Sequence, residues 1–340
     1  MAEGVPLERG GRPTLKTISR ITGLGVTTVS RALKDGPELS RETRARVQAV
    51  AAEIGYRPDR AGVRLRTGRT FVIGLILDQS VSVAEFERRM ILGVSQFLVG
   101  TSYHLVVMPQ GRDADPMETV RYFVENGAAD GLIFTHTRPA DARVRYLLDR
   151  NFPFISHGRT EFSEPHAFYD FDNERFTIRA IERLRERGRR RLALVPGPDY
   201  LACARHIRDG FREAGRVPGE RAMVVDGIHL DSELWEFRNA ANRLANSAEP
   251  PDGFICANET GCIALMAGLQ DAGLVIGRDV DLIAKSSSDV LDHIQPAIDS
   301  FHEDYTFAGE ELARLLLKRI SGSPTTELQS IAEPRLQRRT

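Results

Sequence analysis

The sequence of 340 residues has few of the features that mark a secreted, membrane or metal-binding protein. Its three cysteines, Cys203, Cys256 and Cys262, are too few for a disulfide framework and lack the spacing of a zinc site. No apolar run approaches the roughly 18 residues of a membrane span, and the first residues lack the apolar core of a signal peptide. We therefore expect a reduced, cytoplasmic protein with no membrane partner, metal or cofactor.

The net charge is also close to zero, but this small value hides an asymmetry. The whole chain carries a formal charge of −1. Residues 1–70 contain 14 Lys and Arg against 7 Asp and Glu, a net charge of +7, whereas the remainder contains 32 against 40, a net charge of −8. A basic segment joined to an acidic body is typical of a chain whose one end binds a polyanion.

Three short helices are predicted after a disordered tail at residues 1–12. Apolar residues recur at helical spacing at Leu15, Ile18 and Ile21, at Val29, Ala32 and Leu33, and at Val47, Val50, Ala51 and Ile54. Thr14 and Ser40 can cap the first and third helices, and Gly55 can end the third. The turn Gly23-Leu24-Gly25 separates the first two helices. The pattern predicts an all-α helix-turn-helix unit over residues 13–57, followed by a basic hinge over 58–70.

From residue 71 to 340, strand-like and helical patterns alternate. The apolar strand-like runs lie at 71–77, 103–108, 131–134, 153–156, 192–195, 222–225, 253–256 and 281–284. The helical stretches lie at 84–100, 116–127, 140–150, 173–187, 202–214, 231–247 and 259–272. This alternation predicts parallel sheets with helices on both faces. About 270 residues are too many for one compact open sheet, so we expect two doubly wound lobes with a cleft between them.

The second helix is the element suited to reading DNA. Burial of its apolar face leaves outward Val26, Thr27, Ser30 and Arg31. An arginine can bind guanine O6 and N7, a threonine can contact a base, and short hydroxyl side chains such as those of Thr14, Thr28 and Ser30 suit phosphate oxygens. A plain helical hairpin with a solvated polar face would have the same pattern, so the spacing alone leaves both interpretations open.

Six segments occur in the order and spacing of a known family. They are Thr14-Leu15-Lys16, Thr28-Val29-Ser30-Arg31-Ala32-Leu33, Ser40-x-x-Thr43-Arg44, Gly55-Tyr56-Arg57-Pro58, Leu65-Arg66-Thr67-Gly68-Arg69-Thr70 and Ile73-Gly74-Leu75. Through them residues 14–76 resemble the DNA-binding headpiece and hinge of the LacI/GalR family of bacterial transcription regulators. Gly25 departs from the family, which usually has a serine cap there, and Ser19 and Thr22 replace usual alanines.

The resemblance implies roles for individual headpiece residues. Val26, Thr27 and Arg31 match the family's base-reading positions, and Thr14, Thr28, Ser30 and Tyr56 complete the predicted DNA-binding set. Leu65 matches the hinge leucine that wedges into the minor groove and kinks the duplex. A flexible linker with a stray leucine is the alternative interpretation of that segment.

The remaining residues resemble the family's sugar-binding core, a relative of periplasmic binding proteins. The matching segments are Asp170-Phe171-Asp172-Asn173, Arg189-Arg190-Arg191-Leu192-Ala193-Leu194, Asp209-Gly210-Phe211, Asp252-Gly253-Phe254-Ile255-Cys256-Ala257-Asn258-Glu259 and the helix Gly309 to Leu317. The family's ligand lies between the lobes at the carboxyl ends of strands. Effector-binding candidates at such positions are Asp78, Phe86, His136, His157, Arg159, Asp172, Arg205, Asn258 and Lys285. Strand-end polar residues can instead cap the next helix, and Phe86 can belong to the core.

Two departures bear on the effector. Ile207 stands where the family usually has an arginine. Ala284-Lys285-Ser286-Ser287 replaces a glycine-aromatic-aspartate whose aspartate commonly grips the sugar. Lys285 could favour an acidic or phosphorylated ligand, or it could pair with a neighbouring carboxylate. The arginine-rich run 183–191 is expected to be a solvated face with no role in DNA binding.

The family resemblance implies a dimeric transcription regulator, most often a repressor, that binds palindromic operator DNA and responds to a sugar-like effector. The alternative is a sugar kinase or hydrolase with a helical head, but the sequence contains no G-x-x-x-x-G-K-[ST], G-x-S-x-G or H-E-x-x-H motif. A third possibility, a solute-binding protein, is opposed by the basic head and by the lack of a signal peptide.

Overall fold

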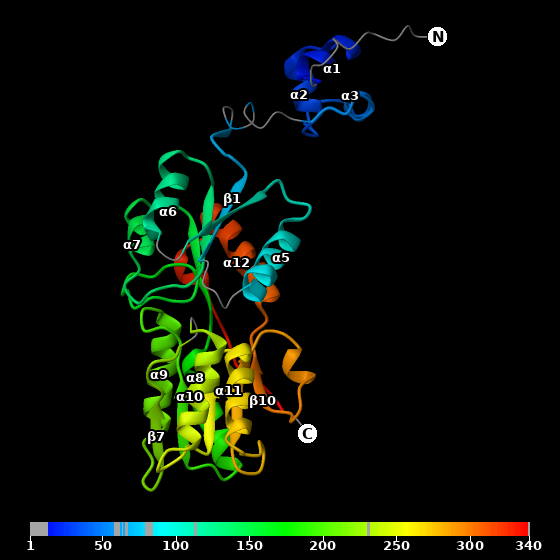
Figure 1. Ribbon diagram of the computed structural model, residues 1–340. Coiled ribbons are helices and arrows are strands. Elements are labelled where there is room, and N and C mark those ends of the chain that lie inside the picture. Colours follow the sequence, from blue (N-terminus) through cyan, green and yellow to red (C-terminus); the bar gives the residue numbers. More distant parts are fainter. Residues whose placement is uncertain are drawn as a thin grey trace. The chain divides into compact units, whose positions relative to one another are not determined.

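The computed structural model describes residues 13–57, 62, 64, 67–78, 84–111, 114–229 and 232–338. The predicted tail and Leu65 lie outside these residues, as does the side chain of Asp78. The chain divides into two compact units, residues 1–70 and 71–340 (Figure 1). Within the described residues, no helix combines the length and the apolar character needed to cross a bilayer.

The N-terminal unit contains the three predicted helices, α1 (Leu15–Thr22), α2 (Val26–Ala32) and α3 (Arg41–Glu53). Their common core is formed by Ile18, Val29, Ala32, Val47 and Ala51. The hydroxyls of Thr14 and Ser40 cap α1 and α3 as expected, and Gly55 follows α3 with a φ of +64°. The helix-turn-helix prediction is therefore confirmed for this segment.

The turn between α1 and α2 is held by the residues that depart from the family pattern. Gly25 is the N-cap of α2 and supplies no side-chain hydrogen bond. Ser19 instead donates its hydroxyl to the Leu24 carbonyl at 2.6 Å, and the Leu24 amide donates to the Thr22 hydroxyl at 3.4 Å. Arg46 of α3 donates to the Thr22 carbonyl at 2.8 Å. These contacts fix the turn although its serine cap is missing.

The N-terminal lobe of the second unit is built on a parallel six-stranded sheet. Its strands, in spatial order, are β11 (Gln329–Ala332), β5 (Phe168–Phe171), β4 (Phe154–His157), β3 (Gly131–Phe134), β1 (Val72–Asp78) and β2 (His104–Gln110). The helices α5 (Ala84–Leu98) and α12 (Tyr305–Ile320) cover one face, and α6 (Pro116–Glu125) and α7 (Ala142–Asp149) cover the other (Figure 1).

The C-terminal lobe repeats this arrangement. Its sheet contains, in spatial order, β12 (Arg335–Gln337), β10 (Asp299–His302), β9 (Asp281–Ser286), β8 (Gly253–Cys256), β6 (Arg191–Val195) and β7 (Arg221–Val224), and only β12 pairs antiparallel among these strands. The pair α8 (Asn173–Glu186) and α9 (Ala202–Ala214) packs on one core, and α10 (Leu234–Ala245) and α11 (Glu259–Asp271) pack on the other. The predicted fold class, a helical headpiece followed by a two-lobed doubly wound core, is confirmed.

Four strands are absent from the sequence prediction: β5, β10, β11 and β12. The last two read QSIA and RLQ, which contain no apolar run. The chain passes between the lobes after β5, again after β10, and a third time between β11 and β12. The missed strands therefore border the interlobe crossings, where pairing across the sheet, and not local hydrophobicity, decides the structure.

The expectation of a solvated arginine face over residues 183–191 is only partly right. Arg183 pairs with Asp299 at 2.6 Å, and Arg187 and Arg189 both pair with Asp281 at 2.8 and 2.6 Å. Both carboxylates are buried. Burial of an aspartate is costly without a countercharge, so these arginines neutralise buried carboxylates of the C-terminal lobe and do not form a free basic surface.

Candidate functional site

The helix α2 exposes the residues predicted to read DNA. Val26 is 41% exposed, and Thr27 and Arg31 are also exposed on the same helix. Thr28 and Ser30 are half-buried. An exposed valine beside a threonine and an arginine forms a mixed apolar and hydrogen-bonding face, which suits the edges of base pairs in a major groove.

Two other predicted DNA-binding residues, Thr14 and Tyr56, make contacts within the headpiece itself. The Thr14 hydroxyl accepts from the Thr17 amide at 3.3 Å, so it serves as a helix cap, although the residue is exposed. Tyr56 is half-buried and packs against the headpiece core. Leu65 lies outside the described residues. The DNA-contact roles of these residues stay predictions.

A pocket lies between the two lobes of the second unit. Five of the predicted effector residues line it: Phe86, His136, His157, Asn258 and Lys285. Phe86 comes from α5, the histidines follow β3 and end β4, Asn258 follows β8, and Lys285 lies on β9. All but Phe86 occupy or directly follow carboxyl ends of parallel strands, where α/β sheets form ligand sites.

The other predicted effector residues have partners at or beyond the pocket rim. Arg159 approaches Asp170 with 3.4 Å between Nε and Oδ2, and Arg205 pairs with Glu161 at 2.7 Å. Asp172 accepts from the Arg175 amide at 3.0 Å and caps α8. The helix-capping alternative therefore describes the local role of Asp172, and also that of Asn258, which accepts from the Gly261 amide at 2.7 Å and caps α11. Arg159, Arg205 and Asp172 are not among the pocket-lining residues.

An aromatic cluster forms the N-terminal wall of the pocket. The Phe86 ring lies 4.6 Å from the Tyr305 ring, 5.5 Å from the His157 ring and 5.4 Å from the His136 ring, measured between centroids. Burial lowers the pKa of His136 to about 3, with the charges of His157 and Arg143 acting in the same direction. His136 is consequently a neutral ring at physiological pH, and it extends the uncharged wall.

Buried charges form the opposite wall. Glu303 directly follows β10. Its Oε1 atom lies 3.2 Å from His157 Nε2, and its carboxylate forms an ion pair with Lys285. Lys285 also donates to Asn173 Oδ1 at 3.0 Å and lies 4.6 Å from the centre of the Phe171 ring. Burial alone would raise the pKa of Glu303, but Lys285 and His157 outweigh it and lower the pKa to about 2. The sequence leaves open whether Lys285 serves an acidic ligand or pairs with a protein carboxylate. In the structure it pairs with a carboxylate, that of Glu303.

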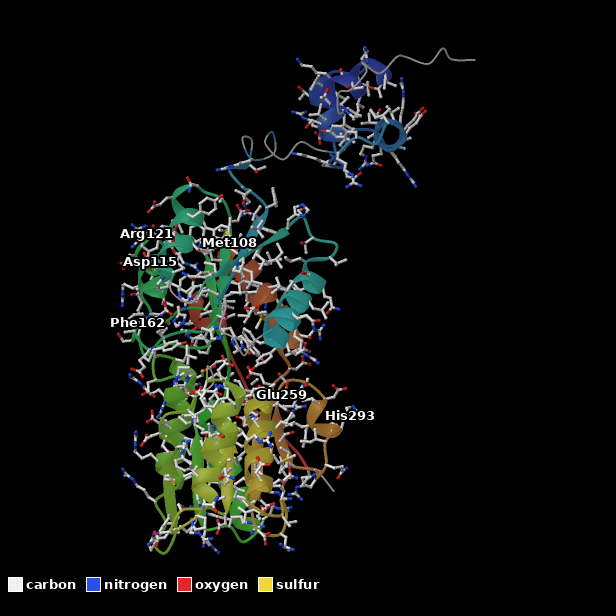
Figure 2. The ribbon with its side chains drawn as sticks, in the orientation of Figure 1. Met108, Asp115, Arg121, Phe162, Glu259 and His293 are labelled. Carbon is white, nitrogen blue, oxygen red and sulfur yellow. The ribbon has the colours of Figure 1, made fainter. Side chains whose placement is uncertain are left out.

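A second pocket carboxylate, that of Asp170, is less strongly stabilised in its charged form than that of Glu303. Burial raises the pKa of Asp170 to about 6, although Arg159 and His157 act against the increase. On the C-terminal lobe, Glu259 lies at the end of α11 nearest the other lobe (Figure 2). It accepts from the amides and hydroxyls of Ser287 and Ser288 at 3.0–3.2 Å. Among the residues that the structure describes, no group of three or more His, Cys, Asp and Glu is arranged to hold a metal ion.

Comparison with known proteins assigns the chain to a family. Residues 14–59 match the family of bacterial regulatory proteins, lacI family, and residues 181–340 match a periplasmic binding protein-like domain. The HTH-type transcriptional regulator RafR of Escherichia coli is 35% identical over 325 residues, which cover 93% of this chain and 94% of RafR. This chain belongs to the lacI family of bacterial transcription regulators.

Two solved structures have the same fold as this regulator. The complex of the transcriptional regulator CelR with cellobiose is 25% identical, with a TM-score of 0.69 over 96% of this chain and 98% of CelR. The lac repressor dimer bound to operator and the anti-inducer ONPF is 19% identical, with a TM-score of 0.80 over 96% of this chain and 98% of that one. The predicted family and the prediction of a DNA-binding transcription regulator are confirmed.

Sequence reasoning missed several residues that line the regulator's pocket. The main ones are Asp170, Asn173, Glu259, Glu303 and Tyr305. Glu303 and Tyr305 follow β10, a strand that the apolar pattern does not predict. A usable signal is the segment His302-Glu303-Asp304-Tyr305, which ends four positions before the first residue of the predicted helix Gly309 to Leu317. Polar residues in front of a helix N-terminus often mark a strand-to-helix loop.

Proposed function

We propose that this lacI-family regulator is a repressor whose affinity for operator DNA is controlled by a neutral sugar bound between its lobes. One observation carries the proposal: the interlobe pocket combines an aromatic wall with hydrogen-bonding side chains, while its lysine, Lys285, is already paired with Glu303. Phe86 supplies the aromatic face, and His157, Asn173 and Asn258 supply polar atoms. Apolar contact with a few convergent polar groups is the usual chemistry of a small-molecule site.

The charge pairing favours a neutral ligand. The Lys285 ammonium is matched by Glu303, and the Asp170 carboxylate faces Arg159. A phosphate or carboxylate on the ligand would have to break the buried Lys285–Glu303 pair, and the Glu303 charge would then be left uncompensated. Hydroxyl groups can bind to both partners without separating them. The structure of CelR in complex with cellobiose, a protein of the same fold, supports a sugar as the ligand.

The repressor mechanism follows from the position of the pocket. Residues from both lobes line it, so a bound ligand has a different affinity for different lobe arrangements and shifts the equilibrium between them. DNA and effector affinities are then coupled by the same factor in both directions. We propose a homodimer with two-fold symmetry that binds a palindromic operator, as the lac repressor dimer on its operator suggests. The cytoplasm is the compartment in which such a repressor meets DNA.

The roles that we propose for the segments of the chain use the boundaries predicted from the sequence. Residues 13–57 bind DNA, 58–70 form the hinge, and 71–340 bind the effector and dimerise. We further propose that the pocket binds its ligand without turnover, since the relatives are transcription regulators. Conversion of a bound sugar to product by the purified protein would contradict this and favour the enzyme alternative.

Effector binding is tested by calorimetric titration of the full chain with cellobiose, other neutral oligosaccharides, their phosphate esters and uronic acids. We expect at least one neutral sugar to bind and to change DNA affinity, while the matched phosphate ester binds far more weakly. Phe86→Ala should weaken the binding, and Tyr122→Ala, which removes an exposed aromatic ring from α6, should leave it unchanged. Tighter binding of the phosphate ester would contradict the neutral-ligand proposal.

DNA reading by α2 is tested with Arg31→Ala. We expect a loss of about 1–3 kcal/mol on operator DNA and relaxed preference at one position of each half-site. Lys34→Ala removes a cation from the second residue after α2 and should weaken binding evenly across sequences. An equal loss for Arg31→Ala on operator and scrambled DNA would contradict base reading by Arg31.

A further inference from the structure

The turn that follows α2 folds back onto the predicted base-reading arginine. The amides of Lys34 and Gly36 both donate to the Arg31 carbonyl at 3.0 Å. Asp35 adopts a φ of +54°, a conformation that reverses the chain at this point. The backbone after α2 is thereby bound to the same residue whose side chain is expected to enter the groove.

The Glu38 side chain also contacts Arg31. Its Oε1 atom lies 3.5 Å from Arg31 Nε, and the two side chains are 47% and 60% exposed. The contact depends on the small residue at position 36. A Cβ atom added to Gly36 would lie 3.0 and 3.1 Å from the two Glu38 carboxylate oxygens and 3.1 Å from the Arg31 carbonyl oxygen. Gly36 therefore leaves the space in which the carboxylate reaches Arg31.

Hydrogen bonds from α3 hold the loop that follows α2. Gln48 of α3 donates to Asp35 Oδ1 at 2.7 Å, and Arg44 of the same helix donates to the Asp35 carbonyl at 3.3 Å. The position of Glu38 is thus linked through Asp35 to the helix that supports the headpiece core, and it does not depend on a free loop.

We propose that Glu38 is a positioning residue for DNA recognition, which orients the Arg31 guanidinium and disfavours DNA that Arg31 does not match. The contact occurs at Nε, so the two terminal nitrogens of Arg31 remain available for guanine O6 and N7. A side chain that is already oriented loses less conformational entropy on binding. The carboxylate charge also repels phosphates, which weakens sequence-independent binding. The inference rests on the proposed base-reading role of Arg31.

The test uses the full chain and a duplex selected by the wild-type protein from a randomised DNA library, with a scrambled duplex as the second probe. We expect Glu38→Gln to bind scrambled DNA more tightly and to lower the ratio of selected to scrambled affinity by roughly three- to tenfold. The base preference lost in Glu38→Gln should fall at the position that Arg31→Ala also relaxes. The double variant should lose no more discrimination than Arg31→Ala alone.

Two further variants separate positioning from charge. Glu53→Gln removes an exposed negative charge at the end of α3 and should leave the affinity ratio unchanged. Gly36→Ala keeps the Glu38 charge but displaces the carboxylate, so it should reduce the ratio as Glu38→Gln does. Gly36 is not among the glycines with positive φ, but its added Cβ would also lie 3.1 Å from the Arg31 carbonyl oxygen, so this variant perturbs the turn together with the carboxylate.

The possible failures are distinguishable. If Arg31→Ala leaves every base preference unchanged, the base-reading role itself is wrong. If Arg31→Ala relaxes a position but Glu38→Gln raises affinity for both duplexes equally, with the ratio unchanged, Glu38 is only a surface charge and the inference is wrong. Additive losses in the double variant would likewise overturn it, because a residue that acts through Arg31 has nothing to position once Arg31 is removed.

Discussion

Replacing Lys285 by methionine removes the countercharge of a buried carboxylate while nearly keeping the side-chain volume. Glu303 is 1% exposed and Lys285 12% exposed at the side chain. His157 remains near the carboxylate, with 3.2 Å between Nε2 and Oε1. The variant therefore leaves a buried negative charge with only His157 and the Tyr305 hydroxyl as partners and with no permanent cation beside it, a situation in which loss of an ion pair is costly.

The order of magnitude of the effect follows from the pKa of Glu303, on which Lys285 and His157 act together against burial. The pKa decreases from 4.5 to about 2 in the folded protein, with Lys285 the largest of the lowering influences. This difference corresponds to about 3 kcal/mol of unfolding free energy, which agrees with the ~3–5 kcal/mol expected for breaking a buried pair. Because the folded pKa is the lower one, the contribution is complete above about pH 4.5 and is lost as the pH falls toward 2.

The assay is urea unfolding followed by circular dichroism, at one protein concentration since the protein is expected to be a dimer. We expect Lys285→Met to lose about 3 kcal/mol at pH 7 and about 1 kcal/mol at pH 3. Lys318→Met, which removes an exposed lysine from α12, is the matched control. The double variant Lys285→Met with Glu303→Gln should recover part of the loss. Equal stability of Lys285→Met and wild type at pH 7 would refute the argument.

Two other perturbations test the fold and the hinge. In Gly93→Ala the added Cβ atom would clash with the Thr306 carbonyl oxygen where α5 contacts α12, so we expect the unfolding free energy to fall by about 1–3 kcal/mol. The control is Gly111→Ala, whose Cβ would have no heavy atom within 4 Å. Equal melting temperatures of the two variants would contradict this packing. Leu65→Ala should reduce operator bending measured by fluorescence energy transfer between the duplex ends, and an unchanged bend would exclude the leucine wedge.

Local patterns in the sequence predict the headpiece well. Its helices are short, their caps are Thr14 and Ser40, and Gly55 ends the third. Each of these signals involves residues within four positions of one another, so it survives without tertiary information. The buried parallel strands of the core, such as Gly131–Phe134 and Gly253–Cys256, are predicted equally well because both faces of such strands are apolar.

The pocket is a different case. The sequence indicates polar residues at strand ends, but it cannot tell which ones converge. Asp172 and Asn173 are neighbours in the chain, yet the first caps α8 and the second accepts a hydrogen bond from Lys285. Glu303 lies 146 positions from His157, and the two meet only because the chain returns to the N-terminal lobe after β10.

The helix-turn-helix, the two doubly wound lobes and the family can be predicted from the chain alone, because they depend on local spacing and on motifs in a fixed order. Tertiary structure alone decided what Lys285 does. Its charge could have served an acidic ligand or a protein carboxylate, and the choice depends on Glu303, which a crossing of the chain brings to it in a buried site. A buried ammonium binds the carboxylate that is nearest in space, and distance along the chain does not predict which one that is.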